Sequence, residues 1–124
     1  MANRNFRDPK VLEPGVVILA GTVTHGADTV ASQTGDGFTV TKGGGTGDYL
    51  ITLANQYPEM LGCFLQLETD DATSDKQYTV TTPTMSARTI TFQTRKSSDG
   101  AAVAAASGDK VHIMIILKNS GVLH

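Results

Sequence analysis

The segment Val111–Lys118, VHIMIILK, constrains the fold more than any other part of the sequence. It is apolar apart from its histidine and its final lysine, and it contains three isoleucines. Because it is too short to cross a membrane as a helix and too rich in β-branched residues for a soluble helix, it predicts a strand that is covered on both faces. In a strand, alternate side chains point to opposite faces. The residues expected to face the domain core are Val111, Ile113, Ile115 and Leu117.

The opposite face of this segment carries His112, Met114 and Ile116. A small β domain has a single interior, so a second apolar face needs a second layer or a neighbouring subunit to cover it. We therefore expect these three residues to lie in an oligomer interface.

The length and the cysteine usage indicate one soluble domain. A chain of 124 residues is long enough to bury a core without disulfides. The single cysteine, Cys63, lies in the apolar run LGCFLQL and is expected to be a buried small hydrophobe. The absence of a disulfide framework fits synthesis in a reducing cytoplasm. No signal peptide or membrane-spanning segment is visible, so we expect a protein without membrane contact.

The charge pattern argues against nucleic-acid binding and for a surface engaged in contacts. The formal net charge is -2, whereas a nucleic-acid-binding domain is usually clearly basic. Charged residues make up only 18% of the chain, which is tolerable when much of the surface is covered by partners.

Short alternating segments separated by turn residues recur at intervals of roughly ten residues along the chain. The pattern predicts an all-β fold, a single antiparallel β-sandwich or barrel of about seven to eight strands over residues 15–124. The segment AAVAAA, Ala101–Ala106, fits either one helical turn or an alanine-lined strand. Gly15–His25 is apolar on both faces, so we expect it beside Val111–Lys118 at the sheet centre, with one-sided strands such as Ala87–Arg95 at the rim. The expected strands are Gly15–His25, Thr29–Gln33, Phe38–Lys42, Asp48–Ala54, Met60–Thr69, Lys76–Thr82, Ala87–Arg95 and Val111–Lys118.

The glycine-rich segment Lys42–Asp48, KGGGTGD, invites comparison with a phosphate-binding loop. Such a loop ends in Gly-Lys-Ser/Thr and opens a helix, whose amides receive the phosphate. Here the lysine precedes the glycines and a strand pattern follows. We interpret the segment as a mobile hairpin loop.

No set of residues predicts catalysis, a metal or a cofactor. The three histidines, His25, His112 and His124, lack the spacing of metal ligands. Asp70, Asp71 and Asp75 lack the pattern of a calcium loop and are interpreted as solvated carboxylates. No nucleophile elbow accompanies the serines, so the chain is not expected to be an enzyme.

Residues 1–14 are expected to form an extended arm. They show no helical or strand period, and two prolines favour extended backbone. A frayed terminus is the plain interpretation. An aromatic residue between arginines, however, suits docking on another protein. This aromatic residue is Phe6, and the residues around it are Asn3, Arg4, Asn5 and Arg7.

Three stretches carry a family resemblance: the opening MANRNF, the segment GDYLITLANQYP, and the near-terminal ILKNS. In these the chain resembles small bacteriophage virion structural proteins of the head decoration, or cement, type. The resemblance implies an oligomeric β body, a homotrimer, that is made in the host cytoplasm and sits on the outer surface of the assembled capsid. It also implies that the arm, at Asn3–Arg7, contacts the major capsid protein.

Two other classes of function stay open at this point. A phage tail or fibre component, or a carbohydrate-binding β-sandwich module, would share the fold class. Carbohydrate sites usually present exposed aromatic side chains, and this chain has no Trp, three Tyr and four Phe. An enzyme of a small β-barrel type is the remaining rival.

Overall fold

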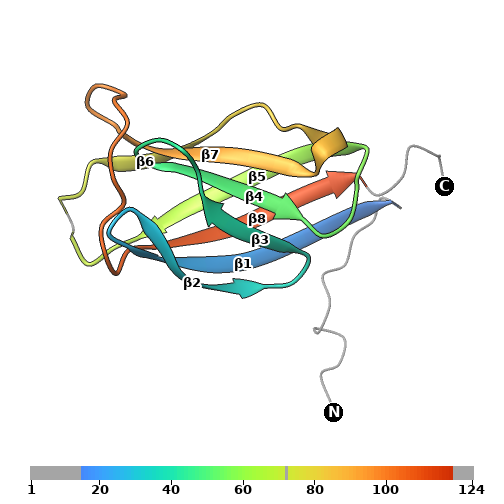
Figure 1. Ribbon diagram of the computed structural model, residues 1–124, viewed down its shortest axis with the longest axis horizontal. Coiled ribbons are helices and arrows are strands. Elements are labelled where there is room, and N and C mark those ends of the chain that lie inside the picture. The colour runs from blue at the N-terminus through green and yellow to red at the C-terminus, as the bar shows by residue number, and fades with distance from the viewer. Residues whose placement is uncertain (1–14, 72, 119–124) are drawn as a thin grey trace, which may run out of the picture.

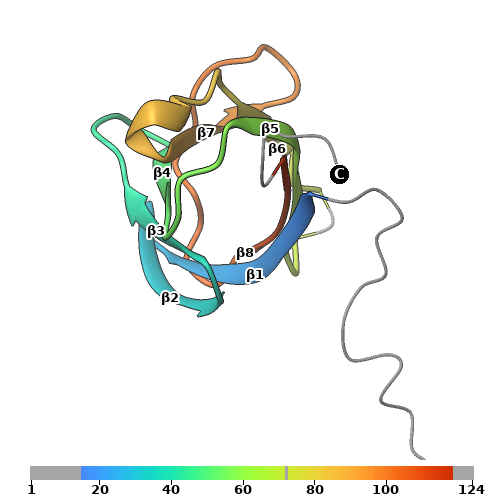
Figure 2. The ribbon, with the colours of Figure 1, turned by 90° about the vertical axis from the view of Figure 1, so that its right-hand side faces the viewer.

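The computed structural model of the chain describes residues 15–71 and 73–118. These residues form two four-stranded antiparallel sheets packed face to face, so the fold is the predicted all-β sandwich (Figure 1; Figure 2). One sheet has the order β2-β1-β8-β5, and the other has the order β3-β4-β7-β6. The strands are β1 (Val16–Gly26), β2 (Thr29–Gly35), β3 (Phe38–Lys42), β4 (Asp48–Leu53), β5 (Glu59–Glu68), β6 (Lys76–Val80), β7 (Thr89–Lys96) and β8 (Lys110–Lys118).

The prediction that the first and last strands are neighbours at the centre of a sheet is confirmed. β1 and β8 pair from Val16↔Lys118 to Thr24↔Lys110 and occupy the two inner positions of their sheet. β5 pairs with the other side of β8, from Glu59↔Lys118 to Glu68↔Lys110. The apolar strand β8 therefore has a hydrogen-bonded neighbour along both edges.

Two expectations about the second sheet and its connections were wrong. The segment Ala87–Arg95 was expected at the rim, but β7 lies between β4 and β6. Its polar face is solvent-exposed because no second layer covers that side, not because the strand is at an edge. The segment Ala101–Ala106 forms neither a helical turn nor a strand, and makes a single bridge between Ala102 and Arg95.

The core lies between the two sheets and is built from alternate residues of the strands. The prediction for β8 is confirmed, since Val111, Ile113, Ile115 and Leu117 are at most 2% exposed. They pack with buried side chains of the facing sheet, including a stacked pair of Tyr49 and Phe92 rings 5.4 Å apart. The other buried hydrophobic side chains of this core are Val23, Phe38, Val40, Ile51, Leu53, Tyr57, Ile90 and Ala105.

The edge strands on the two sides of the sandwich are protected from further pairing in different ways. On the β2–β3 side, the Gln33 amide from β2 accepts a hydrogen bond from the Val40 amide and donates one to the Val40 carbonyl. This side chain thus occupies backbone groups of β3 that face its open edge. On the other side, β5 carries a bulge between Met60 and Gly62, which is a common way to blunt an edge strand.

Candidate functional site

The outward-facing surface of the β2-β1-β8-β5 sheet is the strongest candidate for a functional site. Register places Ala20, Met114 and Phe64 side by side across β1, β8 and β5. The adjacent row brings together Ile18, Ile116 and Gly62, with Leu61 in the bulge beside it. We call this surface the outer face, and its residues are Ile18, Ala20, Thr22, Leu61, Gly62, Phe64, Gln66, His112, Met114 and Ile116.

Solvent-exposed apolar surface is concentrated on the outer face. Within residues 15–71 and 73–118, the large hydrophobic side chains that are exposed are Leu61 (49%), Phe64 (55%) and Met114 (41%). All three lie on β5 or β8. A concentration of this kind on one side of a small domain marks an interaction site more often than an isolated exposed Leu does.

The outer face is hollowed between β5 and β8. A groove of about 210 Å³ is lined by Phe64 and Gln66 on one side and by His112 and Met114 on the other. Its walls are an aromatic ring and a thioether, which are adaptable apolar contacts, and its polar end carries an amide and an imidazole. The groove is therefore suited to a single apolar side chain with a polar or charged neighbour.

A polar row crosses the sheet beside the apolar residues. His112 Nε2 lies 2.7 Å from Glu68 Oε1, and His112 Nδ1 lies 2.9 Å from Thr22 Oγ1. An ionised carboxylate only accepts hydrogen bonds, so the imidazole donates from Nε2. This hydrogen bond, with the nearby charge of Lys110, lowers the pKa of Glu68. The row links β1, β8 and β5 and fixes the orientation of the histidine at the end of the groove.

The residues predicted from β8 lie on the outer face, and further residues join them. Met114 is exposed, His112 and Ile116 are half-buried, and none of the three belongs to the core. Their role in an oligomer interface stays a prediction. Phe64 joins them from β5, where it pairs with Met114. It was not predicted as part of the site, because alternation alone does not tell which strand lies beside β8. The arm residues Asn3, Arg4, Asn5, Phe6 and Arg7 lie outside the described residues.

A second polar cluster lies at the end of the sandwich where β1 meets β2. His25 is 1% exposed, and its Nδ1 donates to the Thr29 carbonyl at 3.2 Å. Its Nε2 then accepts a hydrogen bond from the Tyr78 hydroxyl at 3.1 Å. The Tyr49 ring packs against the imidazole with a centroid distance of 4.8 Å. Both ring nitrogens are therefore satisfied in the neutral form, and burial lowers the pKa of His25.

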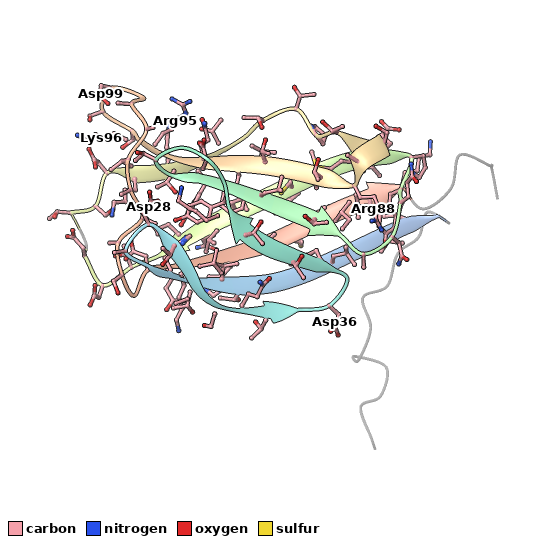
Figure 3. All side chains as sticks on the ribbon, in the orientation of Figure 1. Asp28, Asp36, Arg88, Arg95, Lys96 and Asp99 are labelled. Carbon is pink, nitrogen blue, oxygen red and sulfur yellow. The ribbon has the colours of Figure 1, made fainter. Side chains whose placement is uncertain are left out.

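Asp28 organises the loops at this same end (Figure 3). Its carboxylate accepts hydrogen bonds from the Gly47 and Ala105 amides and from the Tyr49 hydroxyl, at 3.1–3.3 Å. Its backbone amide donates to the Ala105 carbonyl, and Lys42 Nζ lies 3.7 Å from Oδ2. Burial alone would raise the pKa of Asp28, but these donors and the lysine outweigh it and lower the pKa.

The buried cluster predicts a specific loss of stability in mild acid. The pKa of His25 is lower in the folded chain than its ordinary 6.5, so the unfolded chain binds the extra proton first. Stability is therefore full above pH 6.5 and falls as the pH drops toward the folded pKa. Between about pH 7.5 and about pH 5.5 we expect the free energy of unfolding to fall by up to about 1 kcal/mol, measured by urea unfolding. This pH dependence should persist in His112→Gln and flatten in His25→Gln, and an unchanged slope in His25→Gln would contradict the assignment.

The glycine-rich segment Lys42–Asp48 connects β3 to β4, so the predicted hairpin is confirmed. The Lys42 ammonium contacts the Gly43 and Gly45 carbonyls and lies 5.5 Å from the centre of the Tyr49 ring. The Asp48 carboxylate in turn accepts a hydrogen bond from the Gly45 amide. The Gly45 amide and the lysine are thus occupied by groups of the chain itself.

The Cys63 thiol and the Asp71 carboxylate are held in environments that do not favour chemical reactivity. Burial raises the pKa of the Cys63 thiol to about 11, which disfavours the nucleophilic thiolate at neutral pH. Asp71 accepts hydrogen bonds from the Thr73 amide and hydroxyl in a local turn. Within the part of the chain that the structure describes, no group of three or more His, Cys, Asp or Glu side chains is placed to hold a metal ion.

Comparisons with known proteins leave the family open. No protein-family model, curated protein or solved structure significantly matches this chain. Among residues 15–71 and 73–118, no helix has the length and apolar character needed to span a membrane.

Proposed function

We propose that this chain is a bacteriophage capsid decoration, or cement, protein that binds the outer surface of the assembled head and stabilises it. The observation that carries the proposal is the outer face, where Leu61, Phe64 and Met114 are exposed on one side of the sandwich. A face of this kind fits a protein that works by contact with other copies and with a shell. The resemblance of MANRNF, GDYLITLANQYP and ILKNS to small virion proteins supports the same conclusion.

The proposed mechanism is additive binding on a repeating lattice. The arm, through Asn3–Arg7, contacts the major capsid protein, and the outer faces of copies that meet as a homotrimer contact one another through His112, Met114 and Ile116. Three linked arms engage several capsid sites at once, so weak individual contacts give tight attachment. The protein would be made in the host cytoplasm and end on the capsid surface of the virion.

The carbohydrate-binding alternative has less support from the described residues. Of the Phe and Tyr side chains in residues 15–71 and 73–118, Phe64 is exposed and Tyr78 is half-buried, whereas the other four are buried: Phe38, Tyr49, Tyr57 and Phe92. A single exposed ring offers less stacking surface than a sugar-binding platform usually has. A tail or fibre role shares every feature of the outer face and is separated from decoration by experiment.

Deleting residues 1–10 tests the proposal. We expect the truncated chain to keep the circular dichroism spectrum of the full chain, because the described core contains no residue of this segment. It should nevertheless lose binding to assembled heads, by at least about tenfold in affinity, since each arm carries the anchor residues. The readout is co-sedimentation with empty heads of the encoding phage. Unchanged occupancy by the truncated chain would contradict the role of the arm.

A further inference from the structure

We propose that in the free protein residues 1–14 fold back over the outer face of their own chain, with the Phe6 side chain in the groove between Phe64 and Met114. This arm would cover the apolar surface until a partner displaces it. The inference concerns the chain before assembly and goes beyond the proposed function. It follows from the reach of the arm, the size of the apolar area and the chemistry at the groove.

The chain enters β1 at the correct place for this contact. Gly15 has φ 85, a left-handed conformation, so the backbone turns just before Val16 instead of extending β1 backward. Val16 pairs with Lys118, and Lys118 pairs with Glu59, so the arm begins at one end of the outer face. The turn at Gly15 allows the preceding residues to leave the strand direction.

The reach is sufficient. From the row of Glu59 to the groove is about 17 Å along the strands, and from β1 to the β5–β8 groove is about 10 Å across them, or about 20 Å in all. The eight residues between Phe6 and Gly15 allow their Cα atoms to lie up to about 30 Å apart when the chain is extended. The excess leaves room for the two prolines of the arm, Pro9 and Pro14.

The apolar area is small enough for a short peptide segment to cover it. Two rows of side chains on three strands cover about 200 Å². A stable complex of folded proteins buries about 800 Å² on each partner. An arm attached to the same chain needs a smaller contact, because its high effective concentration offsets the weak intrinsic affinity.

The chemistry of the arm matches that of the groove. Phe6 supplies an aromatic side chain for the apolar walls. In an extended segment the Arg4 side chain points to the same side as Phe6 and lies about 6.7 Å further along. Since the arm starts at the Glu59 end of the outer face, Arg4 lies on the side of Phe6 that is nearer to Glu68. The Glu68 side chain is 58% exposed and keeps one oxygen beyond the His112 contact, although Lys110 lies in the same row. The net charges also have opposite signs. The arm has three basic and two acidic residues, whereas the rest of the chain has seven basic and ten acidic residues.

Such a contact would regulate assembly if the proposed function is right. An arm that leaves the outer face to bind the capsid would expose Phe64 and Met114 to neighbouring copies at the same moment. Copies in solution would then stay apart, and copies on the lattice would associate. This coupling rests on the proposed function, whereas the arm contact itself does not.

The experiment uses the full-length chain and its methionine methyl groups. Cys63 is the single cysteine, so Cys63→Ser with Asn5→Cys places one nitroxide spin label beside Phe6. The methyl groups of Met114 on the outer face and of Met85 in the 3-10 turn Met85–Ala87 then report where the label lies. We expect the Met114 signal to lose most of its intensity and the Met85 signal to keep most of its own. Phe6→Ala in the same background should restore Met114.

Each outcome decides the question. Equal loss at Met114 and Met85, or no loss at either, would overturn the proposal, because a free arm samples both sites or neither. In a control mixture, one set of chains carries the nitroxide and a second set, without nitroxide, carries the isotope. The Met114 signal of the second set should stay unaffected. Loss in that mixture would show that the arm belongs to a second copy and would overturn the intramolecular contact. Head binding is measured separately, so either proposal can fail while the other stands.

Discussion

Asp28→Ala is expected to lower the free energy of unfolding by about 3 kcal/mol, the largest effect on stability of any change considered for this chain. The substitution removes the acceptor of the Gly47 and Ala105 amides and of the Tyr49 hydroxyl, and the partner of Lys42. The buried Tyr49 hydroxyl then loses its hydrogen-bond partner. Residue 28 also has φ 55, a left-handed conformation that aspartate and asparagine tolerate better than alanine.

Asp28→Asn is the matched control for this prediction. Asparagine keeps one side-chain acceptor and tolerates the left-handed backbone, so we expect a loss of only about 1 kcal/mol from the missing charge beside Lys42. Urea unfolding followed by tyrosine fluorescence suits a chain that has three Tyr and no Trp. Equal losses in the two variants would show that charge alone matters. A negligible loss in Asp28→Ala would contradict the view that this carboxylate holds the loops together.

The fold was largely predictable because most strands have one buried face. In β4 and β7 every second residue is buried, and that alternation is visible in the sequence. In β8 the buried residues also alternate, although both faces of the strand are apolar. Turn residues such as Gly35-Asp36-Gly37 separate the strands clearly. The position of β7 inside its sheet was not predictable, because an exposed polar face looks the same on an inner strand and on an edge strand.

The loop after β7 was beyond prediction for a different reason. Ala105 is 4% exposed, yet its burial depends on Asp28, which lies far away in the sequence and binds it through both backbone groups. Local propensity left a helical turn and an alanine-lined strand both open, and it carries no information about that partner. The His25–Tyr78 hydrogen bond likewise joins residues whose contact depends on how the two sheets face each other.

The residues that β8 contributes to the candidate site were predictable from the sequence, but those contributed by β5 were not. Alternation within Val111–Lys118 was enough to separate Met114 from the core residues on either side. Phe64 joins Met114 only because β5 pairs with β8 in a register that aligns the two. Strand order is a long-range property, so the groove between these side chains required the structure.

Met114→Asp is expected to leave the fold intact and to abolish the function of the outer face. Met114 is 41% exposed in the sandwich, so once residues 1–14 leave the outer face the carboxylate is hydrated, and the free energy of unfolding should change by less than about 1 kcal/mol. In an assembled state the same carboxylate would be buried without a partner, which costs more than about 2 kcal/mol at each contact. Thr41→Asp is the matched control, since Thr41 is exposed on β3 of the other sheet.

The most direct measurement of the proposed decoration function is the number of copies of the full-length chain that co-sediment with assembled bacteriophage heads. We expect saturable binding, with the unmodified chain and Thr41→Asp reaching the same occupancy and Met114→Asp falling at least about tenfold short in affinity. Failure of the unmodified chain to bind heads would contradict the decoration function. Full occupancy by Met114→Asp would contradict the role of the outer face.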